Sequence, residues 1–147
     1  MDDSRRQLLW HGMFLFLIGL LTGLVGPQFN NPRMGLAAHL EGVMNGTFLV
    51  ALGAIWTEVR LSNGAKTAAY WSSLYGAYMN WTVTTLAAIW GTSAMTPIAS
   101  AGHTAPSWQE RLVAFGFVSV GLAMIASLVL ILWGLRRSAP PKSPSNE

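Results

Sequence analysis

Cysteine is absent from the 147-residue sequence, and charged residues are scarce. Without cysteine, the chain has no disulfide, no thiolate nucleophile, no Cys-ligated zinc site and no iron–sulfur cluster. Charged residues make up 10% of the chain, against roughly 25% in a typical soluble domain. No HExxH motif or phosphate-binding glycine loop is present, and the basic residues flank apolar runs, so the sequence argues against nucleic-acid binding.

Hydrophobic residues make up 52% of the sequence and gather in four long stretches. A helix needs roughly 20 apolar residues to cross a hydrocarbon core about 30 Å thick. The stretches cover about residues 8–25, 36–56, 68–92 and 112–135, and the third is the least hydrophobic. The sequence therefore predicts an all-α membrane protein whose four transmembrane helices form one domain, residues 1–137. The Pro- and Ser-rich tail at 138–147 is expected to be disordered.

Basic residues are distributed unevenly between the two ends of the expected helices. Arg33 and Arg111 fall on one side, and seven fall on the other: Arg5, Arg6, Arg60, Lys66, Arg136, Arg137 and Lys142. The positive-inside rule therefore places both termini in the cytoplasm. A cleaved signal peptide is an alternative interpretation of the first stretch. Because no small-x-small cleavage site follows it, we favour a retained helix.

Few ionisable groups lie inside the expected spans, where such groups are energetically costly and tend to be functional. Glu41 is the only carboxylate well inside a span, and no lysine or arginine in a span can pair with it. The alternatives for Glu41 are a functional role and a wetted position near the outer interface. His11 and His39 also lie in spans, whereas His103 lies in a loop.

The second stretch presents two different faces when it is drawn as a helix. Gly42 and Gly46 lie within about 60° of His39, whereas Glu41 and Asn45 form a second stripe more than about 100° away. The glycines indicate either close helix packing or room for a flat ligand, in which case Gly42 and Gly46 bind a cofactor. His39 is correspondingly either a haem axial ligand or a neutral histidine bonded to a neighbouring helix.

The first and third stretches carry patterns of their own. Gly12, Gly19, Gly23 and Gly26 share one stripe of the first stretch, which predicts a packing seam. The third stretch contains Tyr75, Tyr78 and Asn80 among small and hydroxyl residues. Core packing and interhelical hydrogen bonds explain most of that pattern, and a polar, aromatic-lined pocket for a small aromatic substrate is the functional alternative.

The motif His39-x5-Asn45-Gly46, preceded by "WHGMFLF" at residues 10–16, resembles a known family. That family comprises the small four-helix membrane isomerases that include styrene oxide isomerase, and the resemblance is strongest to its hydroxylaminobenzene mutases. It implies a homotrimer in a bacterial inner membrane, with haem b at the subunit interfaces. His39 matches the axial ligand of the haem iron, and Asn45 matches an asparagine of the substrate pocket.

The resemblance also implies a reaction. The expected activity moves the hydroxyl group of hydroxylaminobenzene from nitrogen to the ortho carbon, giving 2-aminophenol, with ferric haem as a Lewis acid. Such an activity would belong to aromatic-compound degradation, namely nitrobenzene catabolism. Glu41, Tyr75, Tyr78 and Asn80 are candidates for proton handling or ring placement.

Three other functions stay open on the sequence. The first is an aromatic epoxide isomerase, although Glu41 stands where those enzymes have glycine and Tyr75 stands where they have an acid. The second is a b-type haem electron carrier, which would need two axial histidines such as His11 and His39. The third is a haem-free structural or transport subunit.

Overall fold

The computed structural model describes residues 2–136 and contains four long helices. These are α1 (Asp2–Val25), α2 (Pro32–Ile55), α3 (Asn63–Trp90) and α5 (Ser107–Arg136). Two short elements lie in the connections, a 3₁₀ turn at Gly26–Gln28 and α4 at Pro97–Ser100. No β-strand occurs in this described part of the chain, so the all-α prediction is confirmed. The predicted disordered tail lies outside the described residues.

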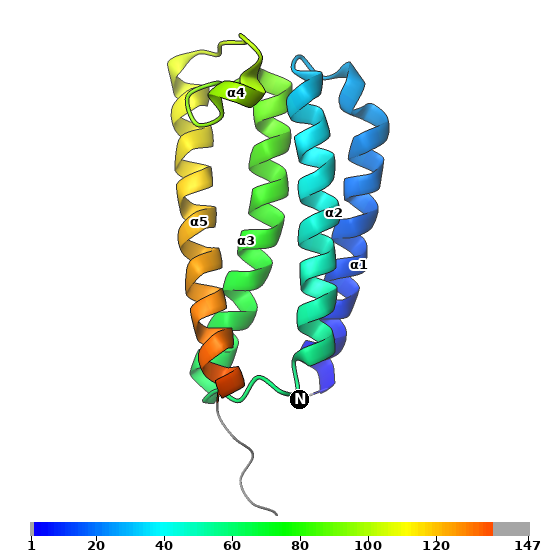
Figure 1. Cartoon of the computed structure of the whole chain (residues 1–147), viewed down its shortest axis with the longest axis vertical. Helices are drawn as coiled ribbons and strands as arrows, with labels where there is room; N and C mark the ends of the chain where they lie inside the picture. The colour runs from blue at the N-terminus through cyan, green and yellow to red at the C-terminus, as the bar shows by residue number, and fades with distance from the viewer. Residues whose placement is uncertain (1, 137–147) are drawn as a thin grey trace, which may run out of the picture.

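The long helices run side by side in alternating directions (Figure 1). α1 packs chiefly against α2, while α3 packs against both α2 and α5. Since α1 begins and α5 ends at the same end of the bundle, the uneven charge is preserved in three dimensions. Five of the seven basic residues expected on one side gather at that end: Arg5, Arg6, Arg60, Lys66 and Arg136. Arg137 and Lys142 fall beyond the residues that the structure describes.

Three helices are long and apolar enough to cross a membrane. They cover residues 3–28, 32–55 and 107–136, with mean hydropathy of 2.0, 1.2 and 2.5 respectively. α3 does not reach the same hydropathy, in agreement with the low hydrophobicity of the third stretch. The count of four spans, the cytoplasmic termini and the trimer therefore stay predictions at this point.

Asn31 ties together three elements at the end of the bundle opposite the termini. Its side-chain oxygen accepts a hydrogen bond from Met34 N at 3.1 Å, which caps α2 just ahead of Pro32 in the first turn. Its amide nitrogen donates to the carbonyls of Ala99 and Ser100 at 2.9 and 3.1 Å. Its backbone N–H donates to Ala88 O at 3.0 Å. The start of α2 is thus joined to α4 and to the last turns of α3.

Glycines bring the backbones of α1 and α2 into direct contact. A Cβ added to Gly19 would lie 2.7 Å from the backbone carbon of Gly42, and one added to Gly46 would lie 2.6 Å from Phe16 N. A Cβ at Gly12 would lie 2.8 Å from Gly46 O. No larger residue fits at these positions without moving a helix. The packing seam predicted for the first stretch is confirmed, and we call this contact the α1–α2 seam.

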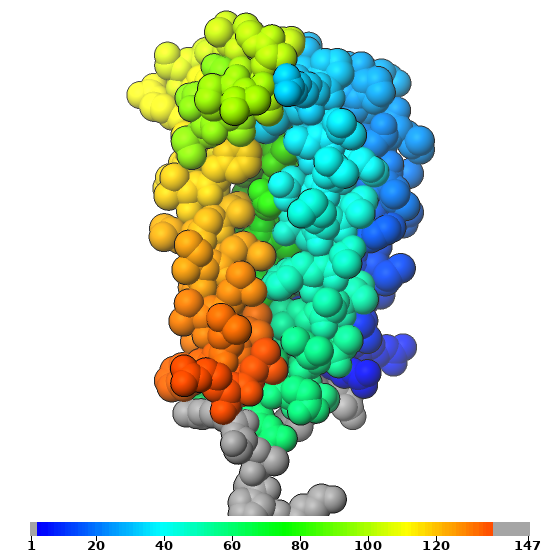
Figure 2. Space-filling view, in the orientation of Figure 1, coloured from blue at the N-terminus to red at the C-terminus, as the bar shows by residue number. Residues whose placement is uncertain are grey.

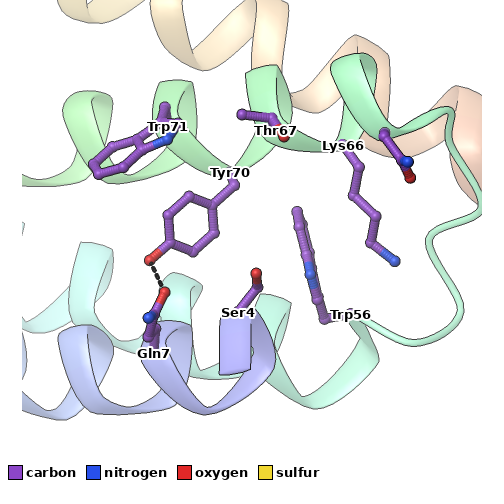
Figure 3. Close-up of a pocket in the computed structure, with 8 residues that line it drawn as sticks. Ser4, Gln7, Trp56, Lys66, Thr67, Tyr70 and Trp71 are labelled. Atoms are coloured by element: carbon purple, nitrogen blue, oxygen red, sulfur yellow. Dashed lines mark hydrogen bonds between the residues drawn. The ribbon is translucent and has the colours of Figure 1, made fainter. Parts of the chain in front are cut away.

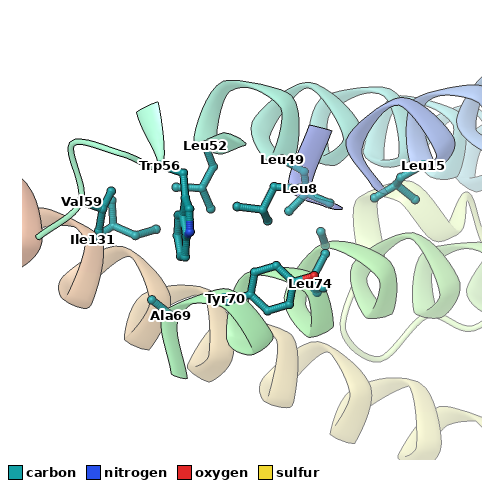
Figure 4. Packing of buried hydrophobic residues seen from close by; sticks show 11 residues of the cluster. Leu8, Leu15, Leu49, Leu52, Trp56, Val59, Ala69, Tyr70, Leu74 and Ile131 are labelled. Carbon is teal, nitrogen blue, oxygen red and sulfur yellow. The ribbon is translucent and has the colours of Figure 1, made fainter. Parts of the chain in front are cut away.

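A hydrophobic cluster holds all four long helices together toward the end where the termini lie (Figure 4). Leu8 of α1, Leu49 of α2 and Trp56 at the end of α2 are almost fully buried in it. α3 adds Tyr70 and α5 adds Ile131, both less than 9% exposed. Because each helix contributes to this cluster, α1 is an integral part of the bundle.

Candidate functional site

His39 is held at the α1–α2 seam, about two turns after α2 begins at Pro32. Its Nδ1–H donates to the backbone carbonyl of Gly19 at 2.9 Å. A Cβ at Gly23 would lie only 2.7 Å from His39 Nδ1, so glycine at this position makes room for the ring. Within the described part of the chain, Nε2 makes no hydrogen bond. The imidazole is therefore anchored through one nitrogen and keeps the lone pair of the other available.

An apolar groove of about 650 Å³ opens beside His39 on the outer surface of α1 and α2. Its walls are leucines that are largely exposed in the single chain, for example Leu24 at 75% and Leu36 at 58%. Gly23, Gly26 and Gly35 also line it, together with two prolines, and no charged residue does. The groove therefore suits a flat apolar group, and it is covered by lipid or another chain rather than by this one.

The glycines predicted to floor this groove lie elsewhere. α1 fills the space beside Gly42 and Gly46, since their added Cβ atoms would meet the backbones of Gly19 and Phe16. The structure thus uses these two glycines for helix packing, which was the other interpretation of the pattern. Sequence reasoning missed Gly35, and it assigned Gly23 and Gly26 to packing alone. The sequence shows glycines at Gly23, Gly26 and Gly35, but their position around His39 becomes clear only when α1 is placed next to α2.

Glu41, Asn45 and Asn80 form a second polar group, which we call the carboxyl–amide cluster. The Asn45 side chain donates to the Glu41 backbone carbonyl at 2.8 Å and to Glu41 Oε2 at 3.0 Å. The Asn80 side chain, from α3, donates to the same Oε2. Asn45 is buried, while Glu41 and Asn80 are half-buried. The sequence predicted all three residues as candidates, but it did not place Asn80 against Glu41.

The His39 groove and the carboxyl–amide cluster lie on different faces of α2. Two residues along a helix turn the side-chain direction by about 200°, so His39 points to α1 while Glu41 points to α3. A single chain therefore does not bring His39 and Asn45 to one site. Both groups act on one reactant only if a second chain supplies the missing half.

The two predicted tyrosines are not part of the carboxyl–amide cluster. The Tyr78 hydroxyl lies 3.0 Å from His11 Nδ1 and bonds α3 to α1. The Tyr75 hydroxyl lies 2.8 Å from Ser119 Oγ and bonds α3 to α5. Both hydrogen bonds fit the interhelical role that explained most of the third stretch. A catalytic role for either tyrosine stays a prediction.

A separate pocket of about 380 Å³ lies where α1 and α3 begin (Figure 3). Tyr70 donates a 2.8 Å hydrogen bond to Gln7 Oε1 at its wall, and Lys66 Nζ lies 5.3 Å from the centre of the Trp56 ring. None of the predicted site residues lines this pocket. It is a polar, aromatic feature of the bundle end, and it is distinct from the His39 groove.

Comparison with known proteins agrees with the resemblance seen in the sequence. The family model described as styrene oxide isomerase matches residues 4–136. The chain belongs to the styrene oxide isomerase family. Among curated relatives, the chain is 51% identical to hydroxylaminobenzene mutase HabB of Ectopseudomonas oleovorans over 138 residues, which cover 93% of this chain and 84% of that protein. It is 42% identical to hydroxylaminobenzene mutase HabA of the same organism over 127 residues, 86% of this chain and 94% of HabA.

Membership of the styrene oxide isomerase family makes the chain a membrane-associated isomerase. It also removes a structural or transport subunit as an interpretation, whereas haem stays a prediction. No solved structure matches the chain.

Proposed function

We propose that the chain converts hydroxylaminobenzene to 2-aminophenol by moving the hydroxyl group from nitrogen to the ortho carbon of the same molecule. The observation that carries this proposal is the 51% identity with a protein named hydroxylaminobenzene mutase, over 93% of the chain. The apolar bundle supports it, because a small aromatic reactant partitions into such surroundings.

We also propose that His39 holds haem b, and the residues around it fit such a group. A histidine that ligates a metal generally donates its other ring N–H to a carbonyl or carboxylate, as His39 does to Gly19 O. The groove beside it is apolar and has no charged residue in its lining, and Gly23 makes room for the imidazole ring. Among residues 2–136 no group of three or more His, Asp or Glu side chains is arranged to hold a bare metal ion, and the proposal rests on His39 as the single protein ligand of a haem iron.

The working unit in this proposal is an oligomer of crossing helices, with three chains as the resemblance implies. In this proposal a neighbouring chain, rather than lipid, packs over the exposed leucines of the His39 groove and brings its own carboxyl–amide cluster to it. α3 is 28 residues long and lies between α2 and α5, so it crosses the membrane with them despite its lower hydropathy. Four crossings leave both termini on one side, which the basic residues mark as cytoplasmic.

The residues of this chain bind and orient the reactant. His39 would hold the haem iron, and ferric haem b when bound supplies a Lewis acid that polarises the N–O bond without a net redox change. Asn45 Oδ1 accepts no hydrogen bond from the described residues, so it is available to the N–H or O–H group of the hydroxylamine. The leucine walls keep water and other nucleophiles away from the electron-poor ring, so that the substrate's own hydroxyl group adds to it.

An aromatic epoxide isomerase is the second candidate, favoured by the description of the family that matches. Its reaction would open the epoxide of styrene oxide and shift a hydride to give phenylacetaldehyde. The relative rates of the purified protein on hydroxylaminobenzene and styrene oxide decide between the two, and we expect the hydroxylamine to be preferred.

A b-type electron carrier finds little support in the helix arrangement. Two axial histidines must face one iron from opposite sides. His39 contacts α1 at Gly19 and Gly23, whereas His11 lies 8–12 residues earlier on α1, roughly 12–18 Å along its axis. His11 also points to Tyr78 of α3 rather than to the His39 groove.

The proposal is tested on protein purified in detergent without chelators. We expect a Soret absorption band and formation of 2-aminophenol from hydroxylaminobenzene. His39→Ala should remove both the Soret band and turnover, whereas His103→Ala, in the loop before α5, should keep them. A colourless, iron-free protein with full turnover would overturn the role of haem, and a protein inactive on hydroxylaminobenzene would overturn the reaction.

A further inference from the structure

The proposed reaction requires a proton to move from a ring carbon to nitrogen, and an iron Lewis acid does not transfer protons. The substrate nitrogen carries one hydrogen and the product nitrogen carries two, while one ring carbon loses its hydrogen. The N–O bond breaks with its electron pair on oxygen, and that oxygen then bonds the ortho carbon. The neutral imine that results must lose its ortho proton, whose bonding electrons restore the aromatic ring, and must gain a proton on nitrogen. A single acid–base group can do both, with no oxidant or reductant.

Glu41 has the structure that such a group needs. Its Oε2 accepts hydrogen bonds from Asn45 and Asn80, whereas Oε1 makes no hydrogen bond within the described part of the chain. Two amide donors on one oxygen fix the orientation of the carboxyl group and support negative charge where no lysine or arginine is paired with it. The other oxygen is thereby left for the reactant.

The surroundings of Glu41 leave space for a reactant. In the upper half of Figure 2, α3 is visible as a recessed surface between α2 and α5. Glu41 projects from α2 onto α3, and it is half-buried rather than enclosed. On the side of α3 that faces α5, Tyr75 is hydrogen-bonded to Ser119. Because Glu41 is half-buried, part of its side chain is accessible from outside the bundle.

We propose that Glu41 is the acid–base catalyst of the reaction, carrying the proton from the ortho carbon to the nitrogen, and that Asn45 and Asn80 are its positioning residues. This inference rests on the proposed function. Glu41 starts as the carboxylate and Oε1 takes the ortho proton of the imine. The resulting acid gives that proton to the imine nitrogen, which yields 2-aminophenol and returns Glu41 to the carboxylate. In the proposed trimer, Glu41 of one chain serves a reactant beside His39 of its neighbour.

Glu41→Gln tests this proposal, because glutamine keeps the size and the acceptor oxygen but does not carry the proton. General acid–base catalysis typically contributes about 10²–10⁴-fold, so we expect kcat on hydroxylaminobenzene to fall about 100-fold with KM and haem content unchanged. Substrate deuterated at both ortho positions should show a larger kinetic isotope effect in the variant than in the wild type. The matched control is Thr47→Val, also on α2, whose hydroxyl bonds only its own helix at Val43 O, 2.8 Å away. It should keep wild-type values.

Two outcomes would overturn the assignment. Wild-type kcat in Glu41→Gln would show that Glu41 only bonds α2 to α3. A lower kcat with an unchanged isotope effect would show that the loss arises in another step. The wild-type assay separates these from failure of the proposed function, in which no 2-aminophenol forms at all. Styrene oxide adds a specific comparison, since a hydride shift needs no external proton and any epoxide turnover should survive Glu41→Gln.

Discussion

The face of α2 that meets α1 and the face that meets α3 are built by different rules. Toward α1, Gly42 and Gly46 let two backbones touch, and among residues 2–136 the only side-chain hydrogen bond from α2 to α1 is that of His39 to Gly19 O. Toward α3, Glu41 and Asn80 join the helices by a hydrogen bond between side chains. Close packing positions His39 because the helices there have almost no freedom to shift. Hydrogen bonding positions Glu41 and leaves its side chain half-buried. The α1 face therefore suits the binding of a cofactor, and the α3 face suits contact with a reactant.

The largest expected effect tests whether the two faces come from different chains. Chains carrying His39→Ala and chains carrying Glu41→Gln should each have little activity alone. Coexpressed and purified as mixed trimers, they should recover about a third of wild-type turnover, because one of the three interfaces in every cyclic trimer that contains both variants combines an intact His39 with an intact Glu41. Turnover of tagged, co-purified mixtures measures this. Activity no higher than that of the better single variant would place both groups in one chain.

The second prediction concerns the glycine contact between α1 and α2. Gly46→Ala puts a Cβ 2.6 Å from Phe16 N, against rigid backbone, and such overpacking typically costs about 1–3 kcal/mol. Thermal unfolding in detergent should show a lower midpoint and a weaker Soret band, because His39 moves with the helix. Gly121→Ala on α5 is the control, since nothing lies within 4 Å of its added Cβ. Equal stability of the two variants would mean that the α1–α2 contact is looser than described.

A comparable or smaller effect is expected at Asn31, which joins the start of α2 to α3 and α4 at one end of the bundle. Asn31→Ala leaves the carbonyls of Ala99 and Ser100 without this donor and Met34 N without its cap, at a cost of about 1–3 kcal/mol. The neighbouring Asn30→Ala removes an exposed hydrogen bond to Ile89 O and should cost less. Chemical denaturation of both variants measures the difference, and the reverse order would contradict it.

The smallest effect concerns a polar contact between α3 and α5. Ser73 and Ser127 are fully buried and share a hydrogen bond, and each hydroxyl also reaches Ala69 O. Interhelical hydrogen bonds in membrane bundles average about 0.6 kcal/mol in double-mutant cycles. The cycle of Ser73→Ala and Ser127→Ala should therefore give a coupling of about that size. A coupling of several kcal/mol would show that polar bonding, rather than packing, dominates this side of the bundle.

The sequence predicted different parts of the His39 groove and of the carboxyl–amide cluster. It singled out His39, Glu41, Asn45 and Asn80, because a polar group in an apolar helix is conspicuous without any structure. It did not separate packing from cofactor binding at Gly42 and Gly46, since both uses require the same small residue. Only the position of α1 resolves that choice, because α1 occupies the space beside them. Tyr75 and Tyr78 lie close to Asn80 in the sequence, which grouped them as candidates for one site. In the structure their hydroxyls bond α5 and α1 instead.

By itself, the sequence determined the all-α class, the apolar helices, their charge asymmetry and the family, because composition and period are properties of each helix alone. The tertiary structure decided which residues meet. Glu41 is bonded to Asn80 across 39 positions, and His39 to Gly19 across 20, and no local pattern encodes such contacts. Their partners depend on the rotation of each helix about its axis, which is set by how glycines, leucines and polar side chains of neighbouring helices pack together.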